Sequence, residues 1–376
     1  GSESAAAVVI DCESGDLLAI GSSPAFDPNL FVNGISVNDY NGLIEDDHRP
    51  LVSKSVQGTY PPGSTFKMVT ALAALEAGIV NSEDTYRCKG HLEVYSQKFG
   101  CWKRSGHGNV DLVRSLRESC DVYFYELALE TGIERISEMA RRLGIGERHD
   151  IPMSAVAEGL APTKEWKNRV KGEDWVIGDS VNASIGQGFV LASPLQLAVM
   201  TARLATGRAV TPRLIKTIDG VEQPSGAGAP MGLNENHLRQ IRKGMYEVVN
   251  HGSGTARGSR ITSPDHQMAG KTGTSQVISR RVKCDEVPWR QRDHALFVNY
   301  APYDNPRIAV SIVVEHGCGG SSTAAPIARD ITLQALYGED PPLSAYPARD
   351  RGRISAQQKR LREMRPPVQG EEPERA

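Results

Sequence analysis

The 376-residue chain has 39% hydrophobic and 23% charged residues, a composition typical of a globular protein that buries a sizeable core. Its 43 basic and 45 acidic residues leave a formal net charge of -2, which excludes nucleic acid or anionic lipid as a partner attracted by overall charge. No run approaches the roughly 18 consecutive apolar residues of a membrane span.

The chain begins with a predicted β-hairpin. Two aliphatic and β-branched runs, residues 5–11 and 16–22, flank a turn-forming cluster at residues 12–15. Gly1 and Ser2 before them are interpreted as the remnant of a cleaved expression tag. A membrane anchor that precedes this chain in the natural protein is therefore compatible with the sequence.

A loop rich in Pro, Asn and Asp is predicted over residues 23–50. Tyr-Pro-Pro-Gly at residues 60–63 then halts the chain before an Ala-rich segment, residues 64–77, which is predicted as a helix. Ser64 therefore begins this helix.

Helical spacing dominates the middle of the chain. Asp111 is expected to cap a first helix, and further helices are predicted over residues 122–130, 133–143, 194–205 and 234–249. Strand patterns then return over residues 268–277, 295–300 and 308–315, followed by a helical stretch over 324–336.

Strands at both ends of the chain predict one sheet built from distant segments. We expect a sheet subdomain from residues 5–63 and 260–338, a helical subdomain over 64–259, and a functional cleft between them, all in one domain spanning 1–340. Residues 341–376 are rich in Pro, Arg, Glu and Gln, so a disordered tail is expected there.

Ser64 and Lys67 form the first candidate catalytic pair. Serine is a poor nucleophile unless a base removes its proton, and a lysine three positions later on a helix carries its amine one turn away. Lys67 can act as a base near neutral pH if burial or a neighbouring cation lowers its pKa, and Lys271 is the candidate cation. Taken alone, S-x-x-K is a short pattern that chance also produces.

A second element, Lys271-Thr272-Gly273-Thr274, falls inside a predicted strand. A lysine with two hydroxyl groups can bind a carboxylate, and Gly273 permits a close approach. An edge strand here could also pair its backbone with an extended peptide, whereas the simplest alternative is an exposed strand with a glycine bulge.

The third element, Ser119-Cys120-Asp121, lies near a junction between two helices. Ser119 can relay a proton between Lys67 and a leaving amine, and Asp121 can hold a substrate or a neighbouring side chain, although both residues could also simply cap helices. The three elements occur in the order of the serine acyltransferase set S-x-x-K, S-x-N or its variants, and K-T-G.

With these motifs the sequence resembles the penicillin-binding proteins, specifically the transpeptidase domain of the class B, penicillin-binding protein 2 type that serves cell elongation. The resemblance covers roughly residues 5–338 and extends to further segments: residues 27–29 (Asp-Pro-Asn), 31–34, 60–63, 184–188, 252–255 and 293–295. Asp121 in place of the commoner Asn is similar to the elongation type and unlike the division-specific one.

This resemblance implies a mixed α/β (α+β) fold of the penicillin-binding transpeptidase and serine β-lactamase type. Its five-stranded antiparallel sheet is flanked by helices, and a large all-helical subdomain is inserted. It also implies that Ser64 attacks the penultimate D-Ala carbonyl of a peptidoglycan stem peptide and expels the terminal D-Ala, after which an amine of a neighbouring stem takes the acyl group.

The resemblance assigns roles to further groups. Backbone N–H groups of Ser64 and Thr274 would form the oxyanion hole, where one lost donor typically costs ~3 kcal/mol of transition-state stabilisation. Thr272 and Thr274, with Gly273 between them, would hold the terminal carboxylate, and β-lactams would acylate Ser64 as substrate mimics. The chemistry itself needs no cofactor.

Cysteine and histidine form a second constellation, which comprises Cys88, Cys101, His107 and Cys120. Thiolate and imidazole suit a closed tetrahedral zinc site, and some members of the resembled family carry zinc beside the middle motif. A structural zinc ion would clamp the loop at residues 87–107 to the Ser119 turn. The alternative is a Cys88–Cys101 disulfide, with His107 solvated and Cys120 buried.

The remaining cysteines are considered singly. Cys284 and Cys318 flank the strands after the K-T-G motif and could form a bridge, which sequence alone does not decide. Cys12 is expected to be a buried or turn thiol. His294 is expected to be a structural hydrogen-bonding residue, because a Ser/Lys mechanism needs no histidine.

Several functions remain open beside a D,D-transpeptidase. They are a serine β-lactamase or β-lactam-sensing domain, a D,D-carboxypeptidase, and a catalytically silent scaffold. The resemblance implies peptidoglycan stem peptides and β-lactams as ligands, and no nucleic acid. It further implies a location at the periplasmic face of the bacterial inner membrane, with an N-terminal anchor and pedestal outside this chain, and a SEDS-type (RodA-like) membrane glycosyltransferase as partner through those missing regions.

Overall fold

The computed structural model describes residues 4–278 and 283–364. The interpretation of Gly1-Ser2 as a tag remnant and the last part of the expected tail, residues 365–376, lie outside the described residues. Within the described ranges, no helix combines the length and the apolar character needed to cross a bilayer.

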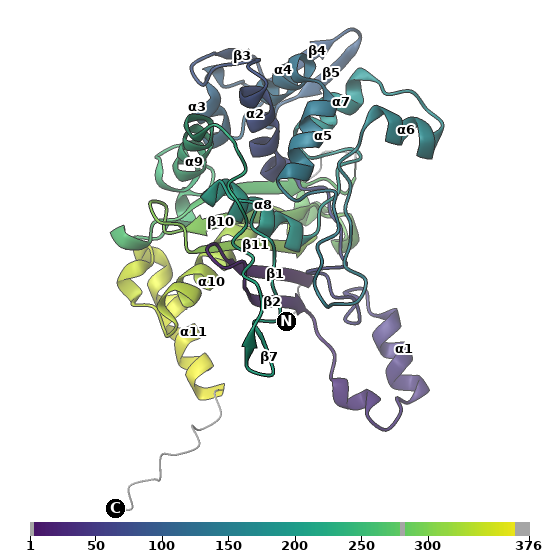
Figure 1. Cartoon of the computed structure of the whole chain (residues 1–376), viewed down its shortest axis with the longest axis vertical. Helices are drawn as coiled ribbons and strands as arrows, with labels where there is room; N and C mark the ends of the chain where they lie inside the picture. Colours follow the sequence, from purple (N-terminus) through teal and green to yellow (C-terminus); the bar gives the residue numbers. More distant parts are fainter. Residues whose placement is uncertain (1–3, 279–282, 365–376) are drawn as a thin grey trace, which may run out of the picture.

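A five-stranded sheet crosses the middle of the molecule (Figure 1). Its order is β2-β1-β11-β10-β9 and all neighbouring strands are antiparallel, as expected. The strands are β1 (Ser4–Asp11), β2 (Leu17–Ser23), β9 (Ala269–Ser275), β10 (His294–Ala301) and β11 (Ile308–Glu315). β1 pairs with β11, so strands far apart in the sequence meet inside the sheet, and the motif strand β9 lies at one edge.

Helices cover both faces of this sheet. Every residue of β11 is buried, because α8 (Pro194–Thr206) packs on one side and α10 (Ala325–Tyr337) on the other. Continuous burial explains why β11 is apolar on both of its faces, apart from Ser311 and Glu315, rather than alternating between apolar and polar residues. α8 therefore belongs to the sheet by its packing, although its sequence position had placed it in the helical subdomain.

The second lobe surrounds α2 (Lys67–Glu76), whose first nine residues are all buried. A helix that is enclosed on all sides loses its amphipathic pattern, which agrees with its Ala-rich sequence. Helices around it include α3 (Leu112–Arg117), α4 (Asp121–Thr131), α5 (Ile133–Arg142), α7 (Ile177–Ser184) and α9 (Glu235–Asn250), while α6 (Lys164–Lys171) lies further out.

This lobe is not all-helical, in contrast to the expectation. It contains two small antiparallel sheets, formed by β3 (Tyr86–Cys88) with β6 (Gly108–Val110) and by β4 (His91–Val94) with β5 (Gln97–Gly100). Three or four residues are too short for an alternating pattern to be recognised, and the segment therefore read as a loop. A further short hairpin, β7 (Thr217–Ile218) with β8 (Val221–Glu222), projects from the molecule.

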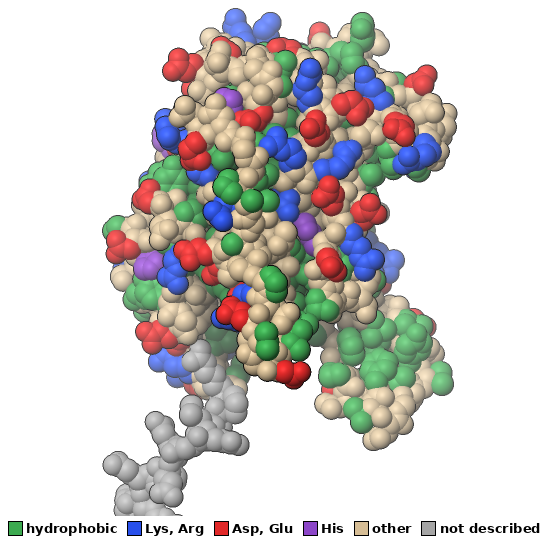
Figure 2. Space-filling model, viewed as in Figure 1, with side chains coloured by type: hydrophobic (Ala, Val, Ile, Leu, Met, Phe, Trp, Pro, Cys, Tyr) green, Lys and Arg blue, Asp and Glu red, His purple; other side chains and the backbone are tan. Residues whose placement is uncertain are grey.

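The expected loop at 23–50 contains the helix α1 (Val37–Glu45), which has no buried residue. Apolar side chains are exposed along this arm, among them Phe31, Val32 and Val37. Figure 2 shows them gathered on the lobe at the lower right. This arm is thus an exposed apolar surface of the described structure.

Residues 341–364 also differ from the expected disordered tail, because α11 (Arg351–Met364) follows the sheet domain. The fully buried guanidinium of Arg329 donates to Asp350 at 2.5 Å just before α11, and Ile354 is 2% exposed. An ion pair with a buried charge and a few buried apolar residues (Ala345, Tyr346 and Ile354) hold this polar segment, and its overall composition does not reveal them.

Candidate active site

Ser64 lies in the 3₁₀ turn η2 (Gly63–Phe66), and Lys67 begins α2 directly after it. The two residues therefore share one helical run, as expected. Ser64 is half-buried and lines a cavity of about 710 Å³, whereas the Lys67 side chain is fully buried. The candidate nucleophile therefore reaches the cavity, while the amine of Lys67, three residues later, is shielded from water.

The Lys67 ammonium donates three hydrogen bonds to the middle motif. Its acceptors are the Ser119 carbonyl at 2.9 Å, Ser119 Oγ at 3.2 Å and Asp121 Oδ1 at 2.7 Å. Asp121 therefore holds Lys67 in place, which is the neighbour-holding role predicted for it. These contacts join α2 to the start of α4, more than 50 residues later.

Ser119 occupies the turn between α3 and α4 with φ of 54°, in the left-handed region that disfavours residues with a Cβ. Such a conformation costs of order 1–3 kcal/mol and persists where surrounding contacts determine it. Lys271 supplies one of these contacts, because its Nζ donates to Ser119 Oγ at 2.9 Å. The Ser119 hydroxyl therefore lies between two lysines.

Lys271 is the lysine whose pKa the structure lowers well below the usual value. Full burial is the main cause, the charge of Lys67 adds to it, and the Asp121 carboxylate opposes it. Lys271 had been expected to act as the cation that lowers the pKa of Lys67. In the structure the lowered pKa is that of Lys271 itself, and its main cause is burial.

The motif strand β9 lies against the nucleophile turn. A Cβ added at Gly273 would meet the Pro62 carbonyl oxygen at 3.0 Å and Thr65 Cγ2 at 2.9 Å. The glycine therefore allows the approach of η2 to the strand, rather than only that of a ligand as predicted. This close contact sets Thr272 and Thr274 at the same cavity as Ser64.

The Thr274 backbone faces the free edge of the sheet. Its carbonyl accepts a hydrogen bond from Gln187 Nε2 at 3.0 Å, and the N–H and carbonyl of one strand residue point to the same side. The Thr274 N–H thus points to the side of the strand that lines the cavity, as its predicted role as an oxyanion donor requires. Thr272 lies two residues earlier, and its Oγ1 is 2.9 Å from Thr255 Oγ1.

Sequence reasoning missed Trp102, which joins the loop beside the nucleophile to the middle motif. Its backbone N–H donates to Asp121 Oδ2 at 2.8 Å, and its indole Nε1–H donates to the carbonyls of Glu118 and Ser119 at 3.0 and 3.1 Å. Its side chain also lines the cavity. The position after Cys101 was the only signal available, and it does not reveal these contacts.

The four residues proposed for zinc come together. One ligand atom from each of Cys88, Cys101, His107 and Cys120 lies within 4.8 Å of the others, and all four residues are buried. His107 Nδ1 is 3.5 Å from Cys88 Sγ and 3.6 Å from Cys101 Sγ, and the three cysteines are free thiols. The alternative Cys88–Cys101 disulfide is therefore not formed in the structure.

The thiols of this cluster differ in acidity. Hydrogen bonding to Cys120 lowers the pKa of Cys101, with further help from His107 and the Asp121 N–H, while its bond to Cys101 and burial raise the pKa of Cys120. Cys120 precedes Asp121 as the first residue outside α4. The cluster thus lies directly behind the residues that hold Lys67.

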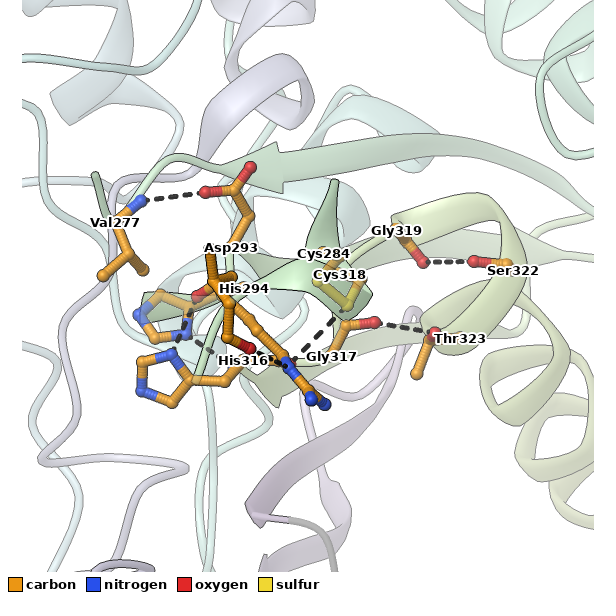
Figure 3. Close-up of a disulfide and its surroundings, with 12 residues drawn as sticks. Val277, Cys284, Asp293, His294, His316, Gly317, Cys318, Gly319, Ser322 and Thr323 are labelled. Carbon is orange, nitrogen blue, oxygen red and sulfur yellow. Dashed lines mark hydrogen bonds between the residues drawn. A yellow bond between two sulfur atoms is a disulfide. The ribbon is translucent and has the colours of Figure 1, made fainter. Parts of the chain in front are cut away.

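Cys284 and Cys318 form a disulfide with a Cα–Cα distance of 5.8 Å (Figure 3). Cys12 is fully buried, as expected. His294 accepts a hydrogen bond from the His316 N–H at 2.9 Å, in agreement with a structural role. Burial, aided by the nearby His316, lowers the pKa of His294 to about 4.

The chain matches the family model described as penicillin binding protein transpeptidase domain over residues 5–333. A curated relative from Acinetobacter baumannii, named peptidoglycan D,D-transpeptidase MrdA, is 41% identical over 331 residues, 85% of this chain and 49% of its own length. The chain thus spans about half the length of that relative.

Solved structures agree with this match. Penicillin-binding protein 2 of Pseudomonas aeruginosa, in complex with WCK 5153, is 40% identical with a TM-score of 0.79, covering 89% of this chain and 71% of that one. The Helicobacter pylori protein of the same name, in complex with MreC, is 37% identical with a TM-score of 0.80, covering 89% of this chain and 60% of that one. The predicted fold class and the resemblance to this type are confirmed.

Proposed function

We propose that this chain, which belongs to the penicillin-binding protein transpeptidase domain family, is the cross-linking part of a peptidoglycan D,D-transpeptidase that acts in cell elongation. Ser64 would attack the carbonyl of the penultimate D-Ala of a stem peptide and release the terminal D-Ala. An amine of a neighbouring stem would then take the acyl group. The convergence of Lys67 and Lys271 on Ser119 Oγ beside Ser64 carries the proposal.

In the first step Lys67, as a neutral amine, would accept the Ser64 hydroxyl proton while Ser64 Oγ forms its bond to the carbonyl carbon. The ammonium that results has acceptors in place, because the Ser119 carbonyl, Ser119 Oγ and Asp121 already surround Nζ. Stabilising the charge where it forms requires no rearrangement of solvent.

Ser119 would pass the proton onward. Its Oγ accepts from Lys67 and Lys271, which leaves its own hydrogen free to donate to the nitrogen of the departing D-Ala. As the C–N bond breaks, the proton from Ser64 thus ends on the leaving amine through Lys67 and Ser119. The reverse sequence would deprotonate the acceptor amine in the second step.

Binding would use the motif strand. The hydroxyls of Thr272 and Thr274 would hold the terminal carboxylate of the stem peptide, with Thr255 orienting the Thr272 hydroxyl. Because β9 is an edge strand, an extended peptide can pair with its backbone. The N–H groups of Thr274 and of Ser64, in the first turn of its helical run, would bind the carbonyl oxygen during attack.

We also propose that the Cys88, Cys101, His107 and Cys120 cluster holds structural zinc. Three thiols and an imidazole are a donor set that zinc uses in closed sites, and their mutual approach within 4.8 Å in a buried position fits it. The ion would supply cross-linking of these four side chains and no part of the acyl transfer. Joined in this way, the four residues would clamp the loop carrying Trp102 to the Ser119 turn, which the Trp102 indole also contacts.

By the same family membership, the natural protein would act at the periplasmic face of the inner membrane, held by an N-terminal anchor. Its proposed partner is a SEDS-type (RodA-like) glycosyltransferase that binds through regions outside this chain. Nucleic acid is not among its proposed partners, because the net charge of -2 provides no overall attraction.

Covalent labelling with a fluorescent penicillin, followed by peptide mapping, tests the central proposal. We expect label on the peptide containing Ser64, no label in Ser64→Ala, and undiminished label in Ser321→Ala, a control serine that lines the same cavity. Label on another residue contradicts the assignment, and failure of the wild type to label would favour a silent scaffold.

The lifetime of the acyl-enzyme and the products of the reaction distinguish the alternative functions. An acyl-enzyme that lasts for hours excludes an efficient β-lactamase. With a donor stem peptide and an amine acceptor, a transpeptidase yields a cross-linked product, whereas a D,D-carboxypeptidase yields only the shortened peptide and free D-Ala.

A further inference from the structure

The Cys284–Cys318 disulfide joins two segments that both line the cavity containing Ser64. Cys284 begins the short 3₁₀ turn η5 (Cys284–Glu286) in the connection between β9 and β10. Cys318 lies in the turn between β11 and the π-helical turn η7 (Gly320–Ala324). Figure 3 shows the bond beside Asp293, His316 and Gly319.

The β11–η7 turn is firmly placed against the catalytic strand. A Cβ added at Gly320 would meet the Gly273 and Leu296 carbonyl oxygens, each at 2.3 Å, so only glycine allows this contact. Thr323 Oγ1 also donates to the Gly317 carbonyl at 2.8 Å within the turn. Cys318 is therefore attached to a segment that lies directly on the K-T-G motif.

The described part of the β9–β10 connection forms a wall of the cavity with both apolar and polar side chains. Its described residues, 276–278 and 283–293, contribute the apolar side chains of Ile278 and Val287 and the polar side chains of Gln276 and Gln291. Unlike the hydroxyl groups of the motif threonines, these side chains present both apolar and polar surface and suit contacts with the variable part of a ligand.

Hydrogen bonds hold this wall near its junction with β10. The Val277 N–H donates to Asp293 Oδ1 at 3.1 Å, and the Cys318 N–H donates to the Asp293 carbonyl at 2.8 Å. The disulfide adds a covalent attachment at Cys284, nine residues before Asp293, at the part of the wall that carries Val287. It thereby links the wall to the Gly320 turn and, through it, to the motif strand.

We propose that the Cys284–Cys318 disulfide is a positioning element that makes the cavity selective for acyl donors with large side chains. It fixes Val287 in a preformed wall, so that a large donor side chain is bound at a lower cost in conformational entropy. A small donor uses only Ser64 and the motif threonines and gains little from the wall. This inference rests on the proposed acylation of Ser64.

The test compares acylation by two β-lactams, followed by intact-protein mass spectrometry. One is a penicillin with a large acylamino side chain, and the other is 6-aminopenicillanic acid, which has a free amino group there. The proteins are the oxidised wild type, the wild type reduced with excess dithiothreitol, and the double variant Cys284→Ser with Cys318→Ser. Reduction transfers two electrons and two protons to the sulfurs, and dithiothreitol closes to its own cyclic disulfide.

We expect the second-order rate constant for the large donor to fall about tenfold in the reduced protein and in the double variant, and that for the small donor to change less than about twofold. The double variant should not respond to dithiothreitol. A response there would assign the effect to the thiols of the Cys88 cluster and overturn the proposal.

An equal loss for both donors, or no loss, also overturns the proposal, because a merely structural bond would not distinguish donor size. If the double variant does not fold, Val287→Ala with the disulfide intact replaces it, and the same selective loss is expected in smaller measure. Absence of Ser64 acylation by either donor in the oxidised wild type would instead contradict the proposed function, and this inference with it.

Discussion

Two groups of cysteines lie near the same cavity and differ in their surroundings and in the bonds they can form. Cys88, Cys101 and Cys120 are buried with His107 in the helical lobe, behind the Ser119 turn, and their four ligand atoms lie within 4.8 Å. Cys284 and Cys318 are half-buried at the cavity wall beside the sheet, with Cα atoms 5.8 Å apart. The first group suits a metal ion because four donors converge, whereas the second has only one partner for each sulfur.

The comparison shows how position determines what a thiol does. The buried cluster lies behind the residues that hold Lys67 and Ser119, which every acyl donor would need in the proposed reaction. The disulfide supports a wall that only some donors contact. Damage to the first group should therefore affect all reactions of the site, and damage to the second should affect them selectively.

The largest effect is expected for Cys120→Ala. Losing one of four ligands should weaken zinc binding by at least about 100-fold, lower the thermal unfolding midpoint and slow acylation by large and small β-lactams alike. Metal analysis of the purified protein, calorimetry and acylation rates measure these changes. Cys12→Ala is the matched control, since Cys12 is an equally buried thiol outside the cluster. A Cys120→Ala protein that keeps its zinc and its acylation rate would rule out the zinc proposal.

A smaller effect is expected for Trp102→Phe, which keeps an aromatic ring but removes the Nε1–H that bonds the Glu118 and Ser119 carbonyls. Losing such a bond costs about 1 kcal/mol, which corresponds to a three- to tenfold slower acylation of Ser64. Stopped-flow measurement with a chromogenic β-lactam gives the rate.

Trp289→Phe is the matched control, in the same connection as Cys284 of the disulfide. The Trp289 Nε1–H is buried and makes no hydrogen bond with the described part of the chain, so its removal should leave the acylation rate unchanged. Equal acylation rates in the two variants would contradict a positioning role for Trp102.

The smallest effect concerns pH. His294 beside the disulfide wall and His149 in the helical lobe both have a pKa lowered to about 4, chiefly by burial. Below the unfolded value of about 6.5 the unfolded chain binds more protons than the native protein, so stability is fully present above that pH and falls as pH decreases toward 4. Between pH 7 and 6 each histidine should account for a loss of about 1 kcal/mol or less.

Urea unfolding of the wild type and His294→Gln at several pH values measures this contribution. The variant should show a shallower fall in unfolding free energy between pH 7 and 5. The remaining fall should come from His149 and other groups. Identical pH profiles for the two proteins would mean that His294 has no lowered pKa.

Much of the site followed from short motifs. Ser64 with Lys67 depends only on the spacing within one helix, and the helix is present where the Ala-rich segment predicted it. The role of Trp102 could not be predicted, because it depends on the left-handed turn at Ser119 that directs two carbonyls toward the indole. The prediction of disorder from the composition of residues 341–364 was also wrong, because the buried Arg329 forms an ion pair with Asp350 in this polar segment.

The sequence by itself determined which chemical groups the protein has and in what order, because nucleophile, base and thiol are properties of single residues and helical spacing is local. Only the tertiary structure decided that Lys271 reaches Ser119 across 152 positions, that the four buried donors gather, and that Cys284 pairs with Cys318. Each of these contacts closes a long loop and lowers the conformational entropy of the chain. The packing of the whole sheet and its helices offsets this loss, which no local sequence pattern could do.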